Sequence, residues 1–247
     1  MLSLVESFAS IQGEGKFAGR LAVFFRFAGC NLNCAGFNCE LKSPKTGEIL
    51  RGCDTIRAVK TAHFDYEKIS TVSQLLDKIG TNFKNSLPII VITGGEPLLN
   101  YANPLFYEFI DEILKRNFEV HFETNGTIFV DFQKFPLYKN CVFAVSVKLG
   151  NSKEPREKRL NFTALQNLKN NAKIFFYKFV ICKNFDAKSE IYEILEHVYG
   201  EVWCMPLAKN REQLSQNALY CAKFCLQNGF NYSDRLHIRL WNDKNGV

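Results

Sequence analysis

The chain has 247 residues, of which 47% are hydrophobic and 23% are charged, which suits one large domain or two small ones with a sizeable core. The net charge of +6 would attract an anionic substrate. The basic residues are scattered, however, and form no stripe of the kind that nucleic-acid-binding proteins present, which argues against a nucleic-acid partner.

The beginning of the chain lacks the features of a secretory signal, because Glu6 interrupts what would be its apolar region. The longest apolar runs have the length of a strand and are too short to span a membrane. Nine cysteines, an odd number, favour a reducing compartment over a disulfide framework. We therefore expect a cytoplasmic protein with no membrane contact.

Short apolar runs typical of strands alternate with helical patterns along the chain. The predicted strands are 21–27, 88–93, 118–122, 141–147, 174–182 and 202–205. The predicted helices are 71–79, with Thr71 as N-cap, 104–115, 161–170, 189–199 and 211–228, the last stopped at Asn228-Gly229. This alternation predicts parallel strands linked by helices, and the continuous apolar strands predict a sheet covered on most of both faces.

We expect one domain over residues 1–247, because no internal repeat or low-complexity linker divides the chain. The stretch 40–52 is polar, contains Gly and Pro and lacks periodicity, so it is the best candidate for an insertion. In a parallel α/β sheet the reacting groups gather at the carboxyl ends of the strands. The residues that follow each predicted strand are therefore the first candidates for a site.

Four cysteines follow the first predicted strand, namely Cys30, Cys34, Cys39 and Cys53. Iron–sulfur clusters use thiolates because soft sulfur matches the metal. Buried free cysteines or a four-cysteine zinc site are the alternatives. Spacing alone leaves cluster and zinc equally open.

Polar motifs also follow the later strands. In "TGGEP" (93–97) two glycines would let the backbone approach a ligand, although a tight turn with Glu96 as a helix cap is the alternative. "ETNGT" (123–127) and "WCMPL" (203–207) follow further strands. Ser146 and Lys148 share one face of a strand by the two-residue period. Together these motifs place polar groups at the ends of successive strands.

The pattern Cys30-Asn-Leu-x-Cys34 followed by "TGGEP" resembles the radical S-adenosylmethionine superfamily. Within it, "ESFASIQGEG" (6–15), "FRFAGCNL" (25–32) and "CDT" (53–55) resemble the 7-carboxy-7-deazaguanine synthase family. The resemblance covers nearly the whole chain. It implies an α/β fold, an incomplete (β/α) barrel of radical SAM type with mostly parallel strands.

The resemblance also implies an enzyme, a radical SAM carbon–nitrogen lyase. A 4Fe-4S cluster held by three cysteines would bind S-adenosylmethionine at its fourth iron and generate a 5′-deoxyadenosyl radical. This radical would start the contraction of 6-carboxy-5,6,7,8-tetrahydropterin to 7-carboxy-7-deazaguanine, with loss of ammonia, in queuosine biosynthesis. Mg²⁺, a flavodoxin- or ferredoxin-type electron donor and a homodimer are further implications.

The same resemblance assigns individual residues. The substrate would be bound by Ile11, Gln12, Gly13, Glu14, Arg26, Thr93 and His237. S-adenosylmethionine would be bound by Gly95, Glu96, Glu123, Asn125, Ser146, Val147, Lys148, Met205 and Pro206. Arg26 would hold the substrate carboxylate with its planar guanidinium. Met205 replaces a glutamine of the family, so a contact there would use backbone or apolar surface.

The third cluster ligand departs from the family pattern, which often reads Cys-x3-Cys-x2-Cys-Asp-Thr. Cys53 keeps the Asp-Thr, so we expect Cys30, Cys34 and Cys53 to hold the cluster, with 40–52 inserted between them. About sixteen added residues cost on the order of 1–2 kcal/mol of loop-closure free energy. Cys39 in place of Cys53 is the alternative.

Magnesium is a hard ion that prefers oxygen ligands. By the resemblance Thr55 would bind it, with Asp54 as the competing ligand. His237 is expected in a C-terminal strand, as in the family. Some relatives reach the substrate with a C-terminal carboxylate, and the extension to Val247 leaves that contact open.

The remaining five cysteines are expected to be core thiols, because free cysteine is commonly buried. Cys221 and Cys225 share a helix face, but a second cluster would need two more ligands. Two other functions stay open. A glycyl-radical activase would have no use for "SIQGEG", and a four-cysteine zinc module that binds RNA would not respond to S-adenosylmethionine.

Overall fold

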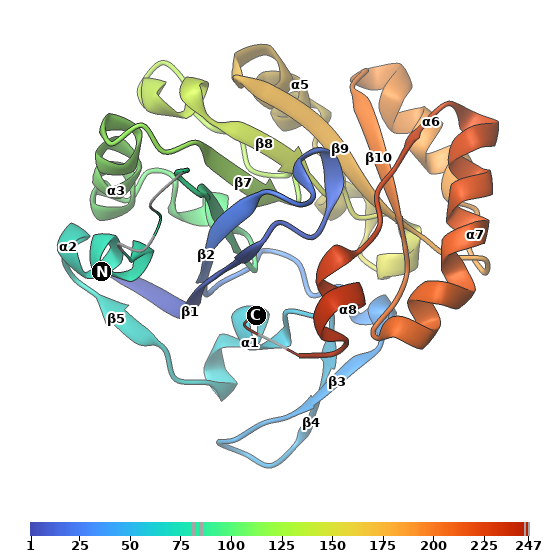
Figure 1. The fold of residues 1–247 in the computed structure, drawn as a ribbon, viewed down its shortest axis with the longest axis horizontal. Helices are drawn as coiled ribbons and strands as arrows, with labels where there is room; N and C mark the ends of the chain where they lie inside the picture. The colour runs from blue at the N-terminus through green and yellow to red at the C-terminus, as the bar shows by residue number, and fades with distance from the viewer. Residues whose placement is uncertain (81–82, 84–85, 245, 247) are drawn as a thin grey trace.

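The computed structural model describes the whole chain except residues 81–82, 84–85, 245 and 247. Its centre is a nine-stranded sheet in the order β11-β10-β9-β8-β7-β6-β2-β1-β5, which curls into an open barrel (Figure 1). The strands of this sheet are β1 (Leu2–Ile11), β2 (Leu21–Phe27), β5 (Glu67–Ile69), β6 (Ile89–Gly94), β7 (Val120–Thr124), β8 (Val142–Val145), β9 (Ile174–Ile181), β10 (Glu201–Pro206) and β11 (Asn231–Tyr232).

All neighbouring strands from β2 to β11 pair in parallel. Only β1 breaks the pattern, because it pairs antiparallel with both β2 and β5. Among the residues that the structure describes, the sheet does not close on itself. The predicted incomplete (β/α) barrel with mostly parallel strands is therefore confirmed.

The α-helices lie mainly on the outside of the barrel (Figure 1). They are α1 (Ile56–Val59), α2 (Val72–Leu76), α3 (Pro104–Lys115), α4 (Arg156–Arg159), α5 (Phe162–Asn171), α6 (Ala187–His197), α7 (Arg211–Asn228) and α8 (Leu236–Trp241). Phe106 and Phe109 of α3 pack edge-on against Phe27 and Phe25 of β2, with ring centroids 5.3 and 5.1 Å apart. This layer between helices and sheet is the main core.

All six predicted strands are present, with ends shifted by up to two residues. The helices predicted at 104–115 and 211–228 have the bounds of α3 and α7. Thr71 forms a capping box with Gln74, as its position before α2 predicts. Gly229 ends α7 at φ 67°, a left-handed conformation that glycine adopts at little cost.

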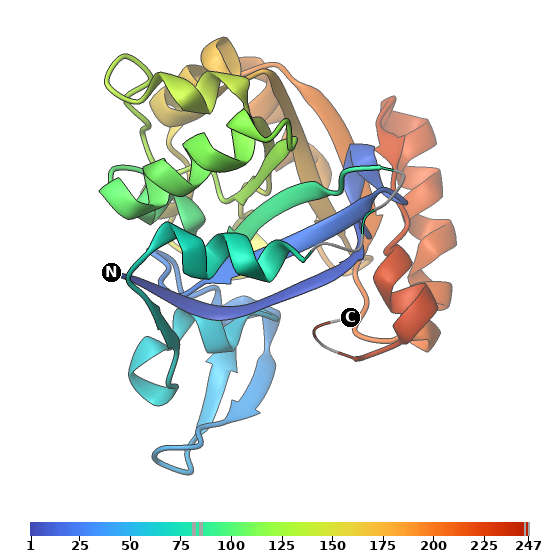
Figure 2. The same cartoon turned by 60° about the vertical axis from the view of Figure 1, so that its left-hand side comes forward.

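Three features differ from the expectations. The ten-residue strand β1 was not predicted, and it contains residues 6–11 of the N-terminal motif. The polar stretch 40–52 is not irregular, because β3 (Cys39–Lys42) and β4 (Ile49–Gly52) pair as an antiparallel hairpin that projects from the barrel (Figure 2). His237 lies in helix α8 rather than in a strand. Only the two residues of β11 extend the sheet at this end.

The interior of the barrel changes from apolar to polar along the strands. At its amino end, Phe17 of the 3-10 turn η1 (Gly15–Phe17) packs against His121 and Phe176, with ring centroids 4.5 and 6.0 Å apart. Toward the carboxyl ends, the same inward-facing rows of β7 and β9 continue with Glu123 and Lys178. The polar end is thus the one where a parallel sheet assembles its site.

None of the helices that the structure describes is long and apolar enough to cross a membrane.

Candidate active site

The cysteine loop follows β2 and is stabilised by a carboxylate from across the barrel mouth. Glu154 accepts the backbone N–H groups of Asn33 and Cys34, at 2.6 and 2.5 Å. Burial raises the pKa of the Cys30 thiol to about 11 and that of the Cys34 thiol to about 12. The ammonium of Lys148 opposes both shifts. A cation beside two buried thiols is suited to thiolates that bind a metal cluster.

Cys53, which follows β4, groups with the first two cysteines. Its charge raises the pKa of both Cys30 and Cys34, so the three thiols lie within electrostatic reach of one another. Cys39 belongs to the hairpin, where it pairs with the residue before Cys53. Burial raises its thiol pKa, and the largest charge acting on it is that of Lys209. Cys53 also acts on the pKa of Cys39, but Cys39 is not among the main charges that act on Cys30 and Cys34.

No three His, Cys, Asp or Glu side chains among the residues described converge on a point that could hold one metal ion. A 4Fe-4S cluster is larger than one ion and takes thiolates at separate irons.

The "TGGEP" turn after β6 packs directly against the cysteine loop. A Cβ at Gly95 would lie 2.2 Å from the carbonyl oxygen of Gly29 and 2.7 Å from Cβ of Cys30, so only glycine fits there. Glu96 donates its backbone N–H to the same oxygen at 2.8 Å. This contact fixes the turn beside Cys30.

The carboxylate of Glu96 is buried and joins two motifs. It accepts the backbone N–H of Leu98, which confirms the capping interpretation, and that of Asn125, at 3.0 and 2.7 Å. It also accepts the hydroxyl of Thr124 at 2.8 Å. Burial raises the pKa of Glu96, against these hydrogen bonds. The side chain thus holds "TGGEP" and "ETNGT" together.

Two more links complete this side of the site. Asn125 donates from its amide to the side-chain oxygen of Asn31 in the cysteine loop, at 3.0 Å. Lys148 donates to the hydroxyl of Ser146 at 3.1 Å, so these two residues do meet as the strand period predicts. The buried Val147 lies between them, and Met205 and Pro206 end β10 and are also buried.

Most of the segment 153–159 is exposed and its last four residues form the short helix α4, but Arg159 at its end is buried. Arg159 at its end pairs with Glu190 at 2.8 Å and donates to the carbonyl oxygen of Lys148 at 3.0 Å. Its guanidinium therefore supports the strand end that carries Lys148.

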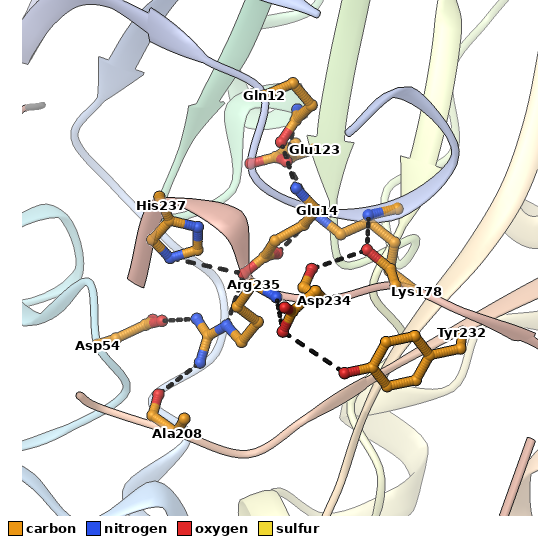
Figure 3. A network of polar contacts seen from close by, with 12 residues as sticks. Gln12, Glu14, Asp54, Glu123, Lys178, Ala208, Tyr232, Asp234, Arg235 and His237 are labelled. Carbon is orange, nitrogen blue, oxygen red and sulfur yellow. Dashed lines mark hydrogen bonds and ion pairs between the residues drawn. The ribbon is translucent and has the colours of Figure 1, made fainter. Parts of the chain in front are cut away.

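The loop after β1, where we expect substrate to bind, meets a buried ion triad, Glu14–Lys178–Glu123. The ammonium of Lys178 lies 2.9 Å from a carboxylate oxygen of each acid (Figure 3). Gln12 donates to Glu123 at 3.4 Å and accepts the backbone N–H of Glu14 at 3.1 Å. Ile11 is the last residue of β1. Glu123, expected at the cofactor, thus also contacts this loop.

The triad remains charged although only 5% of Lys178 is exposed. Burial alone would raise the pKa of Glu14, but Lys178 and Arg235 hold it well below its ordinary value. The pKa of Glu123 is likewise lowered, because Lys178 outweighs burial. Burial would lower the pKa of Lys178, but the two carboxylates raise it. All three pKa shifts favour a charged Lys178 between the ionised carboxylates of Glu14 and Glu123.

The C-terminal segment packs against the loop that contains Gly13 and Glu14. Leu236 donates its backbone N–H to the carbonyl oxygen of Gly13 at 2.9 Å. A Cβ at Gly13 would lie 2.2 Å from Nδ1 of His237, so the close approach requires glycine. His237 Nε2 lies 3.9 Å from Glu14. Burial, assisted by Arg235, lowers the pKa of His237 and favours its neutral form.

Arg26 of β2 also faces this end of the barrel, between Glu6 and Thr93. Its Nε donates to the carboxylate of Glu6 at 2.7 Å. Thr93 is its register partner on β6 and is buried. The Glu6 ion pair was not predicted. It depends on the antiparallel pairing of β1 with β2, which sets Glu6 opposite Arg26.

The turn that follows the hairpin carries the expected magnesium ligand. The Thr55 hydroxyl lies 3.1 Å from the sulfur of Cys53. Thr55 is the N-cap residue of α1 but its side chain makes no capping hydrogen bond. Its oxygen is thus not committed to the helix. Asp54 is 72% exposed at its side chain and lies 3.8 Å from Arg235.

Sequence reasoning missed Lys178 and Arg235. Lys178 had a signal, because it is a lone charge at an inward-facing position of an apolar strand, and charged residues are seldom fully buried without a partner. Arg235 had none, since its importance depends on which loops meet at the C-terminal segment. The other cysteines are core thiols as expected. Cys141, Cys204, Cys221 and Cys225 are buried, and Cys182 is half-buried.

Comparison with known proteins agrees with this geometry. Residues 11–169 match the family described as "4Fe-4S single cluster domain". The 7-carboxy-7-deazaguanine synthase of Rhodopirellula baltica is 29% identical over 260 residues, covering 100% of this chain and 89% of the relative. That of Clostridium acetobutylicum is 32% identical over 194 residues, covering 78% and 74%.

The fold has a counterpart among solved structures. The crystal structure of QueE from Escherichia coli matches with a TM-score of 0.65 and 21% identity, over 96% of this chain and 94% of that one.

Proposed function

The chain belongs to the 7-carboxy-7-deazaguanine synthase family, and on that premise we propose that it converts 6-carboxy-5,6,7,8-tetrahydropterin to 7-carboxy-7-deazaguanine. The reaction is a ring contraction with loss of ammonia, started by radical S-adenosylmethionine chemistry, and it supplies a precursor of queuosine. One observation carries the proposal. Arg235 links the buried Glu14–Lys178–Glu123 triad to the turn that carries Cys53, because it lies 2.8 Å from Glu14 and 3.8 Å from Asp54.

Cys30, Cys34 and Cys53 would hold the 4Fe-4S cluster. When bound, the cluster and S-adenosylmethionine supply the radical, and the protein supplies their positions. The tight "TGGEP" turn supports a cofactor contact beside Cys30. Further contacts to S-adenosylmethionine are proposed for Gly95, Glu96, Glu123, Asn125, Ser146, Val147, Lys148, Met205 and Pro206. Because the carboxylates of Glu96 and Glu123 are already hydrogen-bonded, neighbouring backbone groups are the more available contacts there.

The triad supports a role in reading the pterin ring. The ring presents amino and N–H donors, and an ionised carboxylate is the strongest acceptor that a protein side chain offers. Glu14 and Glu123 stay ionised because Lys178 lies between them. The amide of Gln12 and the neutral ring of His237 adjoin Glu123 and Glu14 respectively.

The substrate carboxylate needs a cation. Arg26 uses Nε for Glu6, and we assign its Nη donors to the substrate carboxylate, beside Thr93. A planar guanidinium suits two parallel hydrogen bonds to a carboxylate. Thr55 would bind Mg²⁺ with its uncapped hydroxyl, in line with the preference of that ion for oxygen. This ion would orient the substrate next to the cluster.

A radical reaction needs protection from water and loose hydrogen donors. The aromatic packing of Phe17 against His121 and Phe176 seals the amino end of the barrel. The C-terminal segment covers Gly13 on the other side. Access is thereby confined to the polar mouth. We also propose a cytoplasmic homodimer that receives electrons from a flavodoxin- or ferredoxin-type donor, and a single domain in which 40–52 is an insertion.

The test is an anaerobic reaction. The wild-type protein is reconstituted with iron and sulfide, then mixed with reductant, S-adenosylmethionine, magnesium and the carboxy-tetrahydropterin, and products are followed by mass. We expect 7-carboxy-7-deazaguanine and 5′-deoxyadenosine. Cleavage of S-adenosylmethionine without the deazaguanine product would reject the substrate. Binding of zinc without iron uptake would reject the whole proposal.

A further inference from the structure

Arg235 joins three loops at the mouth of the barrel. Its Nε donates to Glu14 at 2.8 Å, in the loop after β1. Its Nη1 donates to the carbonyl oxygen of Ala208 at 2.6 Å, in the loop after β10. Its Nη2 lies 3.8 Å from Asp54, in the turn that follows the hairpin (Figure 3).

These contacts are not those of a surface ion pair. Only 11% of the Arg235 side chain is exposed. Burial would lower its pKa, but Glu14 and Asp54 raise it, so the guanidinium stays charged. Each of its three nitrogen atoms faces a protein oxygen, and the guanidinium is rigid and planar. A shift of one loop must therefore strain the contacts to the other two.

Two of the three loops carry the residues proposed for substrate and metal. Glu14 directly follows Gln12-Gly13 and forms one arm of the triad with Lys178. Asp54 lies between Cys53 and Thr55, whose side chains touch at 3.1 Å. The guanidinium is thus the link between the substrate loop and the turn of the third cysteine. The guanidinium faces the carboxylate of Asp54, and Cys53 and Thr55 are the residues directly before and after Asp54.

We propose that Arg235 is a positioning residue that sets the distance between the substrate loop and the Cys53–Thr55 turn. We assign it no direct contact with substrate or metal, because its Nε, Nη1 and Nη2 atoms face Glu14, Ala208 and Asp54. This role rests on the proposed function. It means that the placement of magnesium against the bound pterin depends on a residue of the C-terminal segment.

Arg235→Lys is the variant that tests this role most directly. Lysine keeps the charge but replaces the fork with a single ammonium, which cannot meet three directions at once. We expect kcat/KM to fall by about tenfold to a hundredfold, because small displacements of reacting groups are costly. The magnesium concentration for half-maximal rate and the KM for the pterin should both rise. The iron content should stay at the wild-type level, since no cysteine is changed.

Arg239→Lys is the matched control. Arg239 lies in α8, one turn after Arg235, which is the N-cap residue of this helix. The Arg239 side chain is half-exposed and pairs with Asp234. The same substitution there removes a fork from a surface pair and should leave all four quantities unchanged. Equal losses in both variants would mean that the helix merely tolerates lysine poorly, which would overturn the proposal.

Asp54→Asn tests the contact of Arg235 with Asp54 separately from its contact with Glu14. It should raise the magnesium requirement but leave the pterin KM unchanged. In the double variant with Arg235→Lys, the magnesium requirement should be no higher than in Arg235→Lys alone. Both substitutions remove the same contact, that between Arg235 and Asp54, so their effects should not add. Multiplied effects would show that Asp54 acts independently of Arg235, and the proposal would fail.

A second readout does not require turnover. Amide hydrogen exchange of residues 12–14 and 53–55 is compared in reconstituted wild type, Arg235→Lys and Arg239→Lys without substrate. We expect faster exchange in both segments for Arg235→Lys alone. Normal exchange and normal KM, with only a lower melting temperature, would reduce Arg235 to a structural role. If the wild type makes no deazaguanine, the proposed function fails, while the exchange result still decides whether the two loops are coupled.

Discussion

The ammonium of Lys178 lies 2.9 Å from a carboxylate oxygen of Glu123, between strands β9 and β7 inside the barrel. Removing one partner of a buried ion pair leaves an uncompensated charge. We therefore expect Lys178→Met to lower the free energy of unfolding by about 3–5 kcal/mol. Denaturant unfolding of the unloaded protein under anaerobic conditions measures this value.

Lys16→Met is the control for that experiment. Lys16 also pairs with a glutamate, Glu201, but both side chains are 36% exposed. Exposed pairs contribute about 0–1 kcal/mol, so this variant should unfold almost as the wild type does. A loss for Lys178→Met that is no larger than for Lys16→Met would contradict a charged, buried triad.

The acids and histidines with lowered pKa values predict that stability falls as the pH is lowered, while buried Glu96, whose pKa is raised, acts in the opposite direction. Glu14 and Glu123 have folded pKa values below the unfolded value of 4.5, so their contribution is complete above that pH and is lost as the pH falls through the folded values. His237 and His121 have folded pKa values below the unfolded value of 6.5, so their contribution is lost as the pH falls below 6.5. Lys178, with a raised pKa, keeps its contribution throughout the acid range.

Unfolding free energies measured across this range should therefore decline in two steps. Glu123→Gln should flatten the lower step, because glutamine does not titrate. Glu108→Gln, at an exposed position of α3, should leave the profile unchanged. Identical profiles for wild type and Glu123→Gln would contradict the assigned direction.

The grouping of three thiols predicts unequal roles for the two later cysteines. Cys53→Ala should abolish the cluster, and Cys39→Ala should leave most of it, because Cys39 is not among the main charges that act on Cys30 and Cys34. Iron content and the visible absorption of the reconstituted proteins measure this. Iron kept in Cys53→Ala and lost in Cys39→Ala would show that the ligand set is Cys30, Cys34 and Cys39.

The uncapped hydroxyl of Thr55 predicts a magnesium effect. Thr55→Val keeps the shape but removes the oxygen, so the magnesium concentration for half-maximal rate should rise at least tenfold, or about 1.4 kcal/mol. Thr61→Val, at an exposed position nearby, is the control. An unchanged magnesium requirement in Thr55→Val would point to Asp54 as the ligand instead.

The close approach at Gly95 predicts that alanine is not tolerated there. A Cβ would collide with the Gly29 carbonyl at 2.2 Å, whereas at Gly52 it would meet the carbonyl oxygen of Asn33 at 3.3 Å. Gly95→Ala should cost about 1–3 kcal/mol and most of the cluster. Gly52→Ala should retain iron. Equal iron in both variants would show that the turn can move away from the cysteine loop.

Much of the fold was predictable because its strands are covered on both faces. Continuous apolar runs identified β2, β6, β8 and β9, and Asn228-Gly229 identified the C-terminal end of α7. Strand β1 was missed because "LSLVESFASI" mixes serine and glutamate among apolar residues, and its pairing with β2 rather than its pattern makes it a strand. The exposed hairpin was missed for a similar reason, since only Leu50 of its β4 strand packs in a small satellite core.

The residues of the site also differ in how well the sequence predicts them. Motif residues at strand ends were predictable, because the carboxyl ends of parallel strands meet at one edge. Lys178 and Arg235 were not, because their roles come from partners far away in the chain, such as Glu14 for both. A lone lysine in an apolar strand carries some signal, but a lone arginine in a polar C-terminal segment carries almost none.

The open sheet has a final consequence, which concerns self-association. A barrel that does not close leaves strand edges, and unpaired edges invite pairing with other chains. Here β11 has two residues and β5 has three, and β5 pairs only with Leu2–Leu4 of β1. The rest of β1 begins with a register irregularity between Leu4 and Glu6, followed by the charge of Glu6 itself. Short edges, an irregular register and a charge therefore let the barrel stay open to a large cofactor and substrate without offering a template for aggregation.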